Sequence, residues 1–276
     1  MPFQQLATGI EVYYEIAGDG PPLLLIMGTA ADHSTWNLQV EAYKAHFTVI
    51  TYDARGTGQS TRPIDKDDYS MRILADDVAA LLETIGIDET HVSGLSLGSA
   101  TAQELAINHP HKVKTLQLHC TWGRSDEWFI RMIETNELPV LHDDLARYIR
   151  TALLWVASPT FINDQPEDVE AFESAFIVAN PHPPSKEGMI GHFHADKTHD
   201  ALDRLHQIRV PTLITSGEVD WQVPTRYGLQ VQERIAGATM HIFRGSHSSH
   251  IAFHEMADEW NEFTLHWLLR AETLGR

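Results

Sequence analysis

The residues with the clearest chemical potential lie in the pentapeptide Gly94-Leu95-Ser96-Leu97-Gly98, which matches the pattern G-x-S-x-G. Residues 91–93 before it are strand-like, and residues 100–108 after it have a helical pattern. A sharp turn between a strand and a helix exposes a serine hydroxyl, and flanking glycines relieve crowding at such a turn. The context therefore favours Ser96 as a nucleophile over an incidental serine in a glycine-rich turn.

A serine nucleophile needs partners, because its hydroxyl is weakly reactive until a base removes the proton. Further along the chain, the buried strand-like run 210–215 leads into the acidic residues Glu218 and Asp220. The last strand-like run, 240–243, is followed by Arg244-Gly245-Ser246-His247. The chain order Ser96, Asp220, His247 is the order Ser…Asp…His of one particular fold.

Two histidines compete for the role of the base. His247 follows the last strand by four residues, and His250 comes three residues later, where a helical pattern over residues 252–269 is about to begin. The base must reach Ser96 from the loop immediately after the strand. We therefore predict that His247 is the base, and that His250 packs beside the site or caps the helix.

Strands and helices alternate along most of the chain. Residues 73–85 have apolar side chains at spacings of three and four, which predicts an amphipathic helix ended by Gly86. This alternation predicts a parallel sheet covered on both faces. One segment differs, because residues 122–206 show helical spacing and no convincing strand, so we expect a helical insertion there. The strand-like runs are residues 9–16, 23–27, 47–52, 91–93, 113–119, 212–215 and 240–243.

Together these motifs resemble the α/β-hydrolase fold superfamily, and the resemblance covers nearly the whole chain. Besides the serine turn, the loop 53–60 is similar to the superfamily's D-x-R-G-x-G-x-S loop, and the loop 217–224 is similar to its acid-bearing loop. The resemblance implies an α/β fold with a mostly parallel eight-stranded sheet flanked by helices, and a helical cap inserted after the sixth strand. The core would comprise residues 1–121 and 207–276, and the cap residues 122–206. The acid would be Asp220 rather than Glu218.

An acyl-transfer intermediate carries a negative oxygen that two preorganised N–H donors must stabilise. The expected donors are the backbone N–H after the nucleophile and one in the loop after the third strand, here Leu97 and Thr29. Many members of the superfamily have His-Gly immediately before the donor in the loop after the third strand. This chain has Met27-Gly28-Thr29, which is closer to the Leu-Gly-Thr of enol-lactonase-like members.

The cap is rich in bulky apolar residues, and such a cap over the strand ends would close a mostly apolar pocket. We predict substrate contacts from His33, in the loop after Thr29, and from Trp122 and Trp128. We expect Asp53 and Arg55 to stabilise their own loop.

We predict neither a metal nor a cofactor. The spacing of His192 and His194 is that of some metal sites, but the only acidic residue nearby is Asp196. Acyl transfer by a serine, a histidine, a carboxylate and two backbone donors needs no further group.

Composition limits the partners. The chain has 276 residues with a formal net charge of −18, which repels nucleic-acid phosphates and anionic lipid headgroups. No apolar run reaches the roughly 18 residues that cross a bilayer, and the first residues do not read as a signal peptide. With a single cysteine, Cys120, the chain is expected to be cytoplasmic.

The leading hypothesis is a serine hydrolase that cleaves a small-molecule carboxylic ester or lactone through an acyl-enzyme at Ser96. A carbon–carbon bond hydrolase, a cofactor-free perhydrolase and a ligand-binding receptor with a slow triad remain alternatives. By resemblance, a serine nucleophile speaks against haloalkane dehalogenases and epoxide hydrolases, which have aspartate at this position. Sequence patterns determine neither the natural substrate nor the oligomeric state.

Overall fold

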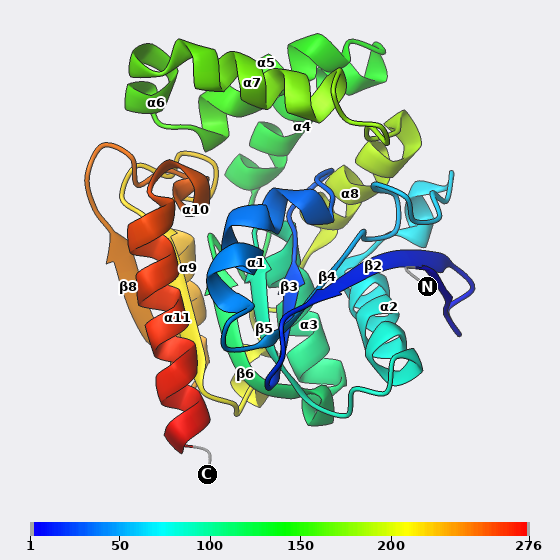
Figure 1. Cartoon of the computed structure of the whole chain (residues 1–276). Helices are drawn as coiled ribbons and strands as arrows, with labels where there is room; N and C mark the ends of the chain where they lie inside the picture. Colours follow the sequence, from blue (N-terminus) through cyan, green and yellow to red (C-terminus); the bar gives the residue numbers. More distant parts are fainter. Residues whose placement is uncertain (1–2, 275–276) are drawn as a thin grey trace.

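The computed structural model describes residues 3–274, whose strands form one eight-stranded sheet in the order β1-β2-β4-β3-β5-β6-β7-β8 (Figure 1). Strands β1 and β2 pair antiparallel with each other, and β2 pairs antiparallel with β4. All other neighbours are parallel, which confirms the predicted sheet. The strands are β1 Phe3–Gln5, β2 Glu11–Ala17, β3 Pro22–Ile26, β4 Thr48–Tyr52, β5 Thr90–Leu95, β6 Val113–His119, β7 Thr212–Gly217 and β8 Thr239–Phe243.

Helices cover both faces of the sheet. In β3, Leu23 and Leu25 belong to one apolar core, which α1 and α11 close, while Leu24 and Ile26 belong to a second core beneath α2, α3 and α9. A strand buried on both faces has no polar side, which is why β3 reads as a continuous apolar run. The helices of the core are α1 Asn37–Tyr43, α2 Met71–Thr84, α3 Leu97–Asn108, α9 Thr225–Arg234, α11 Ala257–Leu274 and the short α10 Ala252–Glu255, which precedes α11.

Five helices are inserted between β6 and β7, which confirms the predicted cap after the sixth strand. The insertion leaves and returns at one place, because an isolated bridge joins Arg124 to Asp200 and their side chains form an ion pair at 2.9 Å. Figure 1 shows these helices above the edge of the sheet from which α3 begins. They are α4 Glu127–Leu141, α5 Leu145–Val156, α6 Pro159–Asp164, α7 Pro166–Ile177 and α8 Lys186–Thr198.

The local patterns located most elements within two residues. The helix predicted over residues 73–85 is α2, which begins two residues earlier because the Ser70 hydroxyl accepts a hydrogen bond from the Ile73 N–H at 3.2 Å and caps it. The short strand β1 was not predicted, since three residues carry no readable period.

Candidate active site

Ser96 occupies the junction between β5 and α3 in a left-handed backbone conformation, with φ of 56° and ψ of −124°. Such a conformation costs a non-glycine residue about 1–3 kcal/mol, so the surrounding packing must hold it. A Cβ at Gly94 would lie 2.3 Å from the carbonyl oxygen of Gly98, and one at Gly98 would lie 2.1 Å from that of Ile26. The two glycines are thus required by the close approach of β3, β5 and α3.

Two backbone N–H groups beside Ser96 are free to bind a ligand. Leu97 is the first residue of α3, where an N–H has no partner within the helix, and the N–H of Thr29 has none among residues 3–274. The loop of Thr29 packs against the nucleophile, since a Cβ at Gly28 would lie 3.2 Å from Ser96 Cβ. Ala30 is different, because its N–H donates to His192 Nδ1 at 3.1 Å.

Asp220 is a buried carboxylate at the end of β7, held by its own loop. Its Oδ1 accepts hydrogen bonds from the backbone N–H groups of Gln222 and Val223, at 3.0 and 2.8 Å. Its Oδ2 lies 3.0 Å from a histidine Nδ1. Glu218 faces the surface instead, where it pairs with Arg244 at 2.9 Å.

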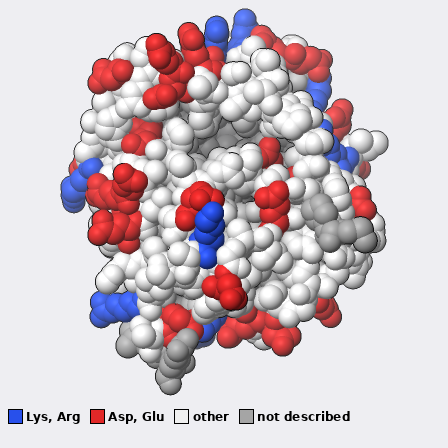
Figure 2. Space-filling model, viewed as in Figure 1, with Lys and Arg blue, Asp and Glu red and all other residues white. Residues whose placement is uncertain are grey.

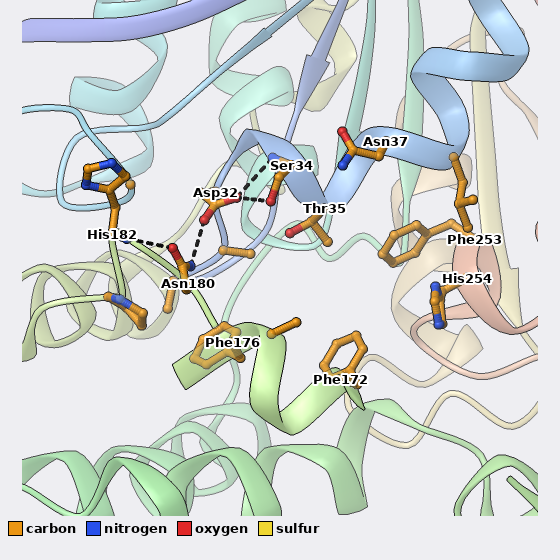
Figure 3. A pocket seen from close by; sticks show the side chains of 16 residues that line it. Asp32, Ser34, Thr35, Asn37, Phe172, Phe176, Asn180, His182, Phe253 and His254 are labelled. Atoms are coloured by element: carbon orange, nitrogen blue, oxygen red, sulfur yellow. Dashed lines mark hydrogen bonds between the residues drawn. The ribbon is translucent and has the colours of Figure 1, made fainter. Parts of the chain in front are cut away.

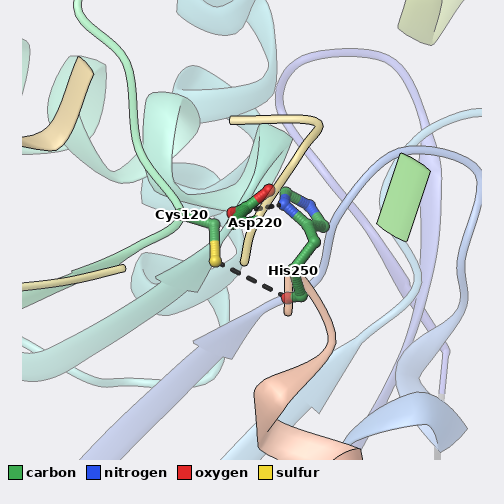
Figure 4. Close-up of side chains that lie close together, drawn as sticks. All are labelled: Cys120, Asp220 and His250. Atoms are coloured by element: carbon green, nitrogen blue, oxygen red, sulfur yellow. Dashed lines mark hydrogen bonds and ion pairs between the residues drawn. The ribbon is translucent and has the colours of Figure 1, made fainter. Parts of the chain in front are cut away.

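The histidine that contacts Asp220 is His250, so the prediction for His247 is wrong (Figure 4). His247 points elsewhere, with its Nδ1 3.4 Å from the Glu255 carboxylate and about a third of its side chain exposed. The reason is a turn after β8 that begins at Gly245, with φ of 101°, and closes with the Ser248 N–H donating to the Gly245 carbonyl. The turn and the residues after it bring His250, three residues later than predicted, against Asp220, while α10 begins at Ala252 as the sequence predicts.

Sequence reasoning assigned no role to Cys120, which lies directly behind this pair. Figure 4 shows its Sγ beside Asp220, donating to the backbone carbonyl of His250 at 3.5 Å. Burial, together with the Asp220 carboxylate, raises the pKa of the thiol well above its usual value, so Cys120 stays protonated. The only sequence feature that could have pointed to Cys120 is its position directly after β6, at the same sheet edge as Ser96 and Asp220.

Ser96 and His250 line one cavity of about 110 Å³ between the core and the cap. Its polar lining residues are Thr29, Thr35, Ser96, Asn136, Tyr148, Gln222 and His250. The apolar wall includes Ile133, Ile149, Ala152, Val156, Phe172, Phe176, Phe193, Ile251 and Phe253.

A second cavity of about 350 Å³ adjoins the first, and the two share Ala31, Thr35, Phe172, Phe176 and Phe253. Figure 3 shows it between α7 of the cap and the loop that leads into α1, where the Asn180 side chain donates to Asp32 at 2.9 Å. In Figure 2 the hollow on the molecular surface is bordered largely by uncharged atoms.

The sequence profile of the alpha/beta hydrolase fold matches residues 21–253. The chain belongs to the alpha/beta hydrolase fold family. It is 32% identical to RutD of Azorhizobium caulinodans over 83% of this chain and 84% of that protein. That relative is named as a carbamate hydrolase. It is 28% identical to 3-oxoadipate enol-lactonase 2 of Acinetobacter baylyi, over 84% of both chains. The crystal structure of the enol-lactonase from Burkholderia xenovorans is 26% identical, with a TM-score of 0.85, and covers 97% of this chain and 100% of that one.

The three predicted substrate contacts of this alpha/beta hydrolase lie outside the cavity of Ser96. Trp122 is buried in the base of the cap, stacked on Phe129 with ring centroids 4.6 Å apart. Trp128 is 41% exposed on the outer surface, and His33 Nδ1 lies 2.6 Å from Asp53. The structure therefore does not place these three residues where we predicted them. Of the three, only Trp128 is on a cap helix, and helical spacing does not say which side of such a helix faces the core.

The D-x-R-G-x-G-x-S loop of the hydrolase is held by hydrogen bonds within itself and to the neighbouring His33 loop and α2. Asp53 accepts hydrogen bonds from the backbone N–H groups of His33 and Gln59, at 2.9 and 2.8 Å. Arg55 forms a bidentate pair with Asp77 at 2.6 and 2.8 Å. His192 also has a structural role, since both of its ring nitrogens bind backbone groups.

Asp196 is a buried carboxylate of α8 beside the Thr29 loop. Its Oδ2 accepts a hydrogen bond from the Thr29 hydroxyl at 2.8 Å, and its Oδ1 has no partner among the residues that the structure describes. Burial raises the pKa of Asp196 to about 7, although the Thr29 hydrogen bond and the charge of Lys197 oppose the shift.

The raised pKa of Asp196 predicts a pH-dependent stability. Above about pH 4 the unfolded chain releases this proton, whereas the folded chain keeps it until about pH 7, so the free energy of unfolding falls across that window. As the pH rises from 5 to 8, the free energy of unfolding of the Asp196→Asn protein should increase by roughly 2–3 kcal/mol relative to that of wild type. The reason is that asparagine stays neutral and still accepts a hydrogen bond from Thr29. Urea unfolding at both pH values measures the difference. Asp164→Asn, at an exposed carboxylate, is the control. If the difference in stability between Asp196→Asn and wild type is the same at both pH values, the raised pKa of Asp196 is contradicted.

None of the helices among residues 3–274 is both long enough and apolar enough to cross a membrane.

Proposed function

We propose that the protein hydrolyses small carboxylic esters or lactones through an acyl-enzyme at Ser96. The observation that supports this most is that Ser96, on its strained turn, and His250, bound to the Asp220 carboxylate, line the same apolar cavity. A nucleophile, a base and an orienting carboxylate in one cavity are the parts that acyl transfer requires.

In the first half-reaction, His250 Nε2 takes the proton of the Ser96 hydroxyl while Oγ attacks the substrate carbonyl. The resulting oxyanion accepts hydrogen bonds from the N–H groups of Leu97 and Thr29. When the intermediate collapses, the bond to the leaving oxygen breaks, and that oxygen takes the proton from His250. The products are an alcohol, or the opened end of a lactone, and an acyl ester on Ser96.

In the second half-reaction, His250 takes a proton from water, whose oxygen attacks the acyl carbonyl. The tetrahedral intermediate expels Ser96 Oγ, which recovers its proton from His250, and the carboxylic acid is released. Asp220 keeps a proton on His250 Nδ1 and stabilises the imidazolium in both halves. Every bond and proton is balanced by these groups, so the proposal includes no metal or organic cofactor.

Related reactions would use the same residues. The relative named for carbamate hydrolysis suggests that carbamate esters belong in any substrate screen. A carbon–carbon bond hydrolase would attack a ketone carbonyl, and a perhydrolase would use peroxide in place of water. A receptor with a slow triad would stop near one turnover.

The experiment is a steady-state screen of p-nitrophenyl acetate, butyrate and octanoate, an aromatic lactone and a p-nitrophenyl carbamate. We expect many turnovers on at least one short ester or lactone, with the Ser96→Ala protein as the blank. A burst of a single turnover would support a receptor, and turnover of the carbamate without turnover of any ester or lactone would replace the proposed substrate class by carbamates. No turnover of any of these compounds would contradict the proposal.

The acid of the triad is predicted to be Asp220. Asp220→Asn should lower kcat by about 10³–10⁴-fold, because an amide favours the wrong tautomer of His250 and cannot stabilise the imidazolium. Glu218→Gln, in the same loop but paired with Arg244 at the surface, is the matched control and should stay within a few-fold of wild type. Measuring kcat for both variants on one ester tests the assignment, and the reverse pattern would exchange the two roles.

A further inference from the structure

Two side chains in the cavity of Ser96 carry polar atoms that the protein does not use. Asn136, on α4, is 97% buried, and its Oδ1 has no hydrogen-bond partner among the residues described. Its amide nitrogen contacts only the sulfur of Met132, at 3.5 Å. A buried polar atom without a partner costs about 1–3 kcal/mol, so Asn136 carries a penalty that a ligand could remove.

Tyr148, on α5, is the second of these side chains. Its ring packs against Phe176 and Phe193, with centroids 6.0 and 5.8 Å away, and its hydroxyl makes no hydrogen bond within residues 3–274. Burial raises the pKa of this hydroxyl, so it keeps its proton and can both donate and accept. Both Asn136 and Tyr148 line the cavity, and both belong to the cap.

The cavity lacks charged partners for an ionic substrate. Its lining contains no Asp, Glu, Lys or Arg among the described residues. The nearby Asp196 carboxylate, which contacts Thr29, would repel an anion when ionised. An uncharged ligand therefore suits the cavity best, since an unpaired ion would lose its hydration without compensation.

We propose that Asn136 and Tyr148 form a polar subsite for a hydroxyl or N–H group of an uncharged ester or lactone. A substrate hydroxyl donates to Asn136 Oδ1 and accepts from the Tyr148 hydroxyl, whereas a substrate N–H only donates to Asn136 Oδ1. In either case the group lies away from the carbonyl that Ser96 attacks. This inference rests on the proposed function, because that proposal is what makes the ligand an ester or a lactone. A site with unpaired buried polar groups discriminates against ligands that lack the matching group.

The test compares two matched pairs of esters, ethyl butyrate with ethyl 3-hydroxybutyrate, and propyl butyrate with 3-hydroxypropyl butyrate. Titration calorimetry on the Ser96→Ala protein gives the Kd of each ester without turnover. The hydroxylated ester of at least one pair should bind at least about 5-fold more tightly, as expected for one recovered hydrogen bond. In the same background, Asn136→Leu should bring that ratio close to one, and Tyr148→Phe should lower it.

Leu138→Ala, at an exposed position on the same helix, is the control and should leave the ratio unchanged. Equal affinity within both pairs, or a preference that survives both Asn136→Leu and Tyr148→Phe, would overturn the subsite. The two proposals fail separately. A preference for the hydroxylated ester in a protein that hydrolyses none of these esters would support the subsite and contradict ester hydrolysis.

Discussion

Replacing Ser96 with alanine should lower kcat for ester hydrolysis by at least ~10³-fold, and by up to about 10⁶-fold if the triad acts as a unit. The variant has no oxygen to form the acyl-enzyme, while the two N–H donors and the cavity remain. Residual hydrolysis would then reflect water attacking a bound and polarised ester. The fold should persist, since alanine is smaller than serine and Ser96 Oγ supports no other side chain of the described structure.

Three measurements check this result. Steady-state kinetics give kcat, and circular dichroism with thermal unfolding shows that the variant is folded. Treatment of the wild-type protein with a fluorophosphonate, followed by peptide mass spectrometry, should locate the label on Ser96. Retention of more than a few per cent of wild-type turnover, or a label on another residue, would remove Ser96 from the mechanism.

The second large effect concerns the base. His250→Ala should lower kcat by at least ~10³-fold, because nothing else in contact with Asp220 can take the proton of Ser96. His247→Ala is a matched control, with the same substitution three residues earlier in the same loop. It should keep kcat within about 5-fold of wild type, since His247 contacts Glu255 and does not line the cavity.

Both variants are measured on one ester between pH 6 and pH 9. An inactive His247→Ala protein with an active His250→Ala protein would mean that the loop rearranges when substrate binds. Equal and small losses in both would mean that neither histidine is the base.

Local signals predicted much of the active site. The turn at Ser96 could be identified because the strand, the two glycines and the helix that create it lie within about 20 residues of sequence. The loop of Asp220 could be placed because it follows a buried strand, and the choice of Asp220 over Glu218 came from the resemblance to the superfamily. Leu97 and Thr29 could be placed because their positions follow from the elements around them. Each of these positions depends on its own neighbours in the chain.

The base could not be assigned from such signals. The path of the loop between β8 and α10 depends on contacts with distant segments. The Val219 N–H donates to the Ser248 carbonyl, and the Ile251 N–H donates to the carbonyl of Val156 in the cap. The spacing of residues 247–250 is compatible with either histidine. Only the packed structure decides which one reaches Asp220.

The lining of the cavity was decided in the same way. Sequence by itself determined the α/β class, the helical insertion over residues 122–206 and the turn at Ser96, because periodicity and short motifs are local properties of the chain. The place of this insertion after the sixth strand and the choice of Asp220 followed from the resemblance to the superfamily. The tertiary structure alone decided that Asn136, Tyr148 and His250 face the cavity while His33, Trp122 and Trp128 do not. The orientation of a cap helix is set by what it packs against, and those partners come from remote parts of the sequence.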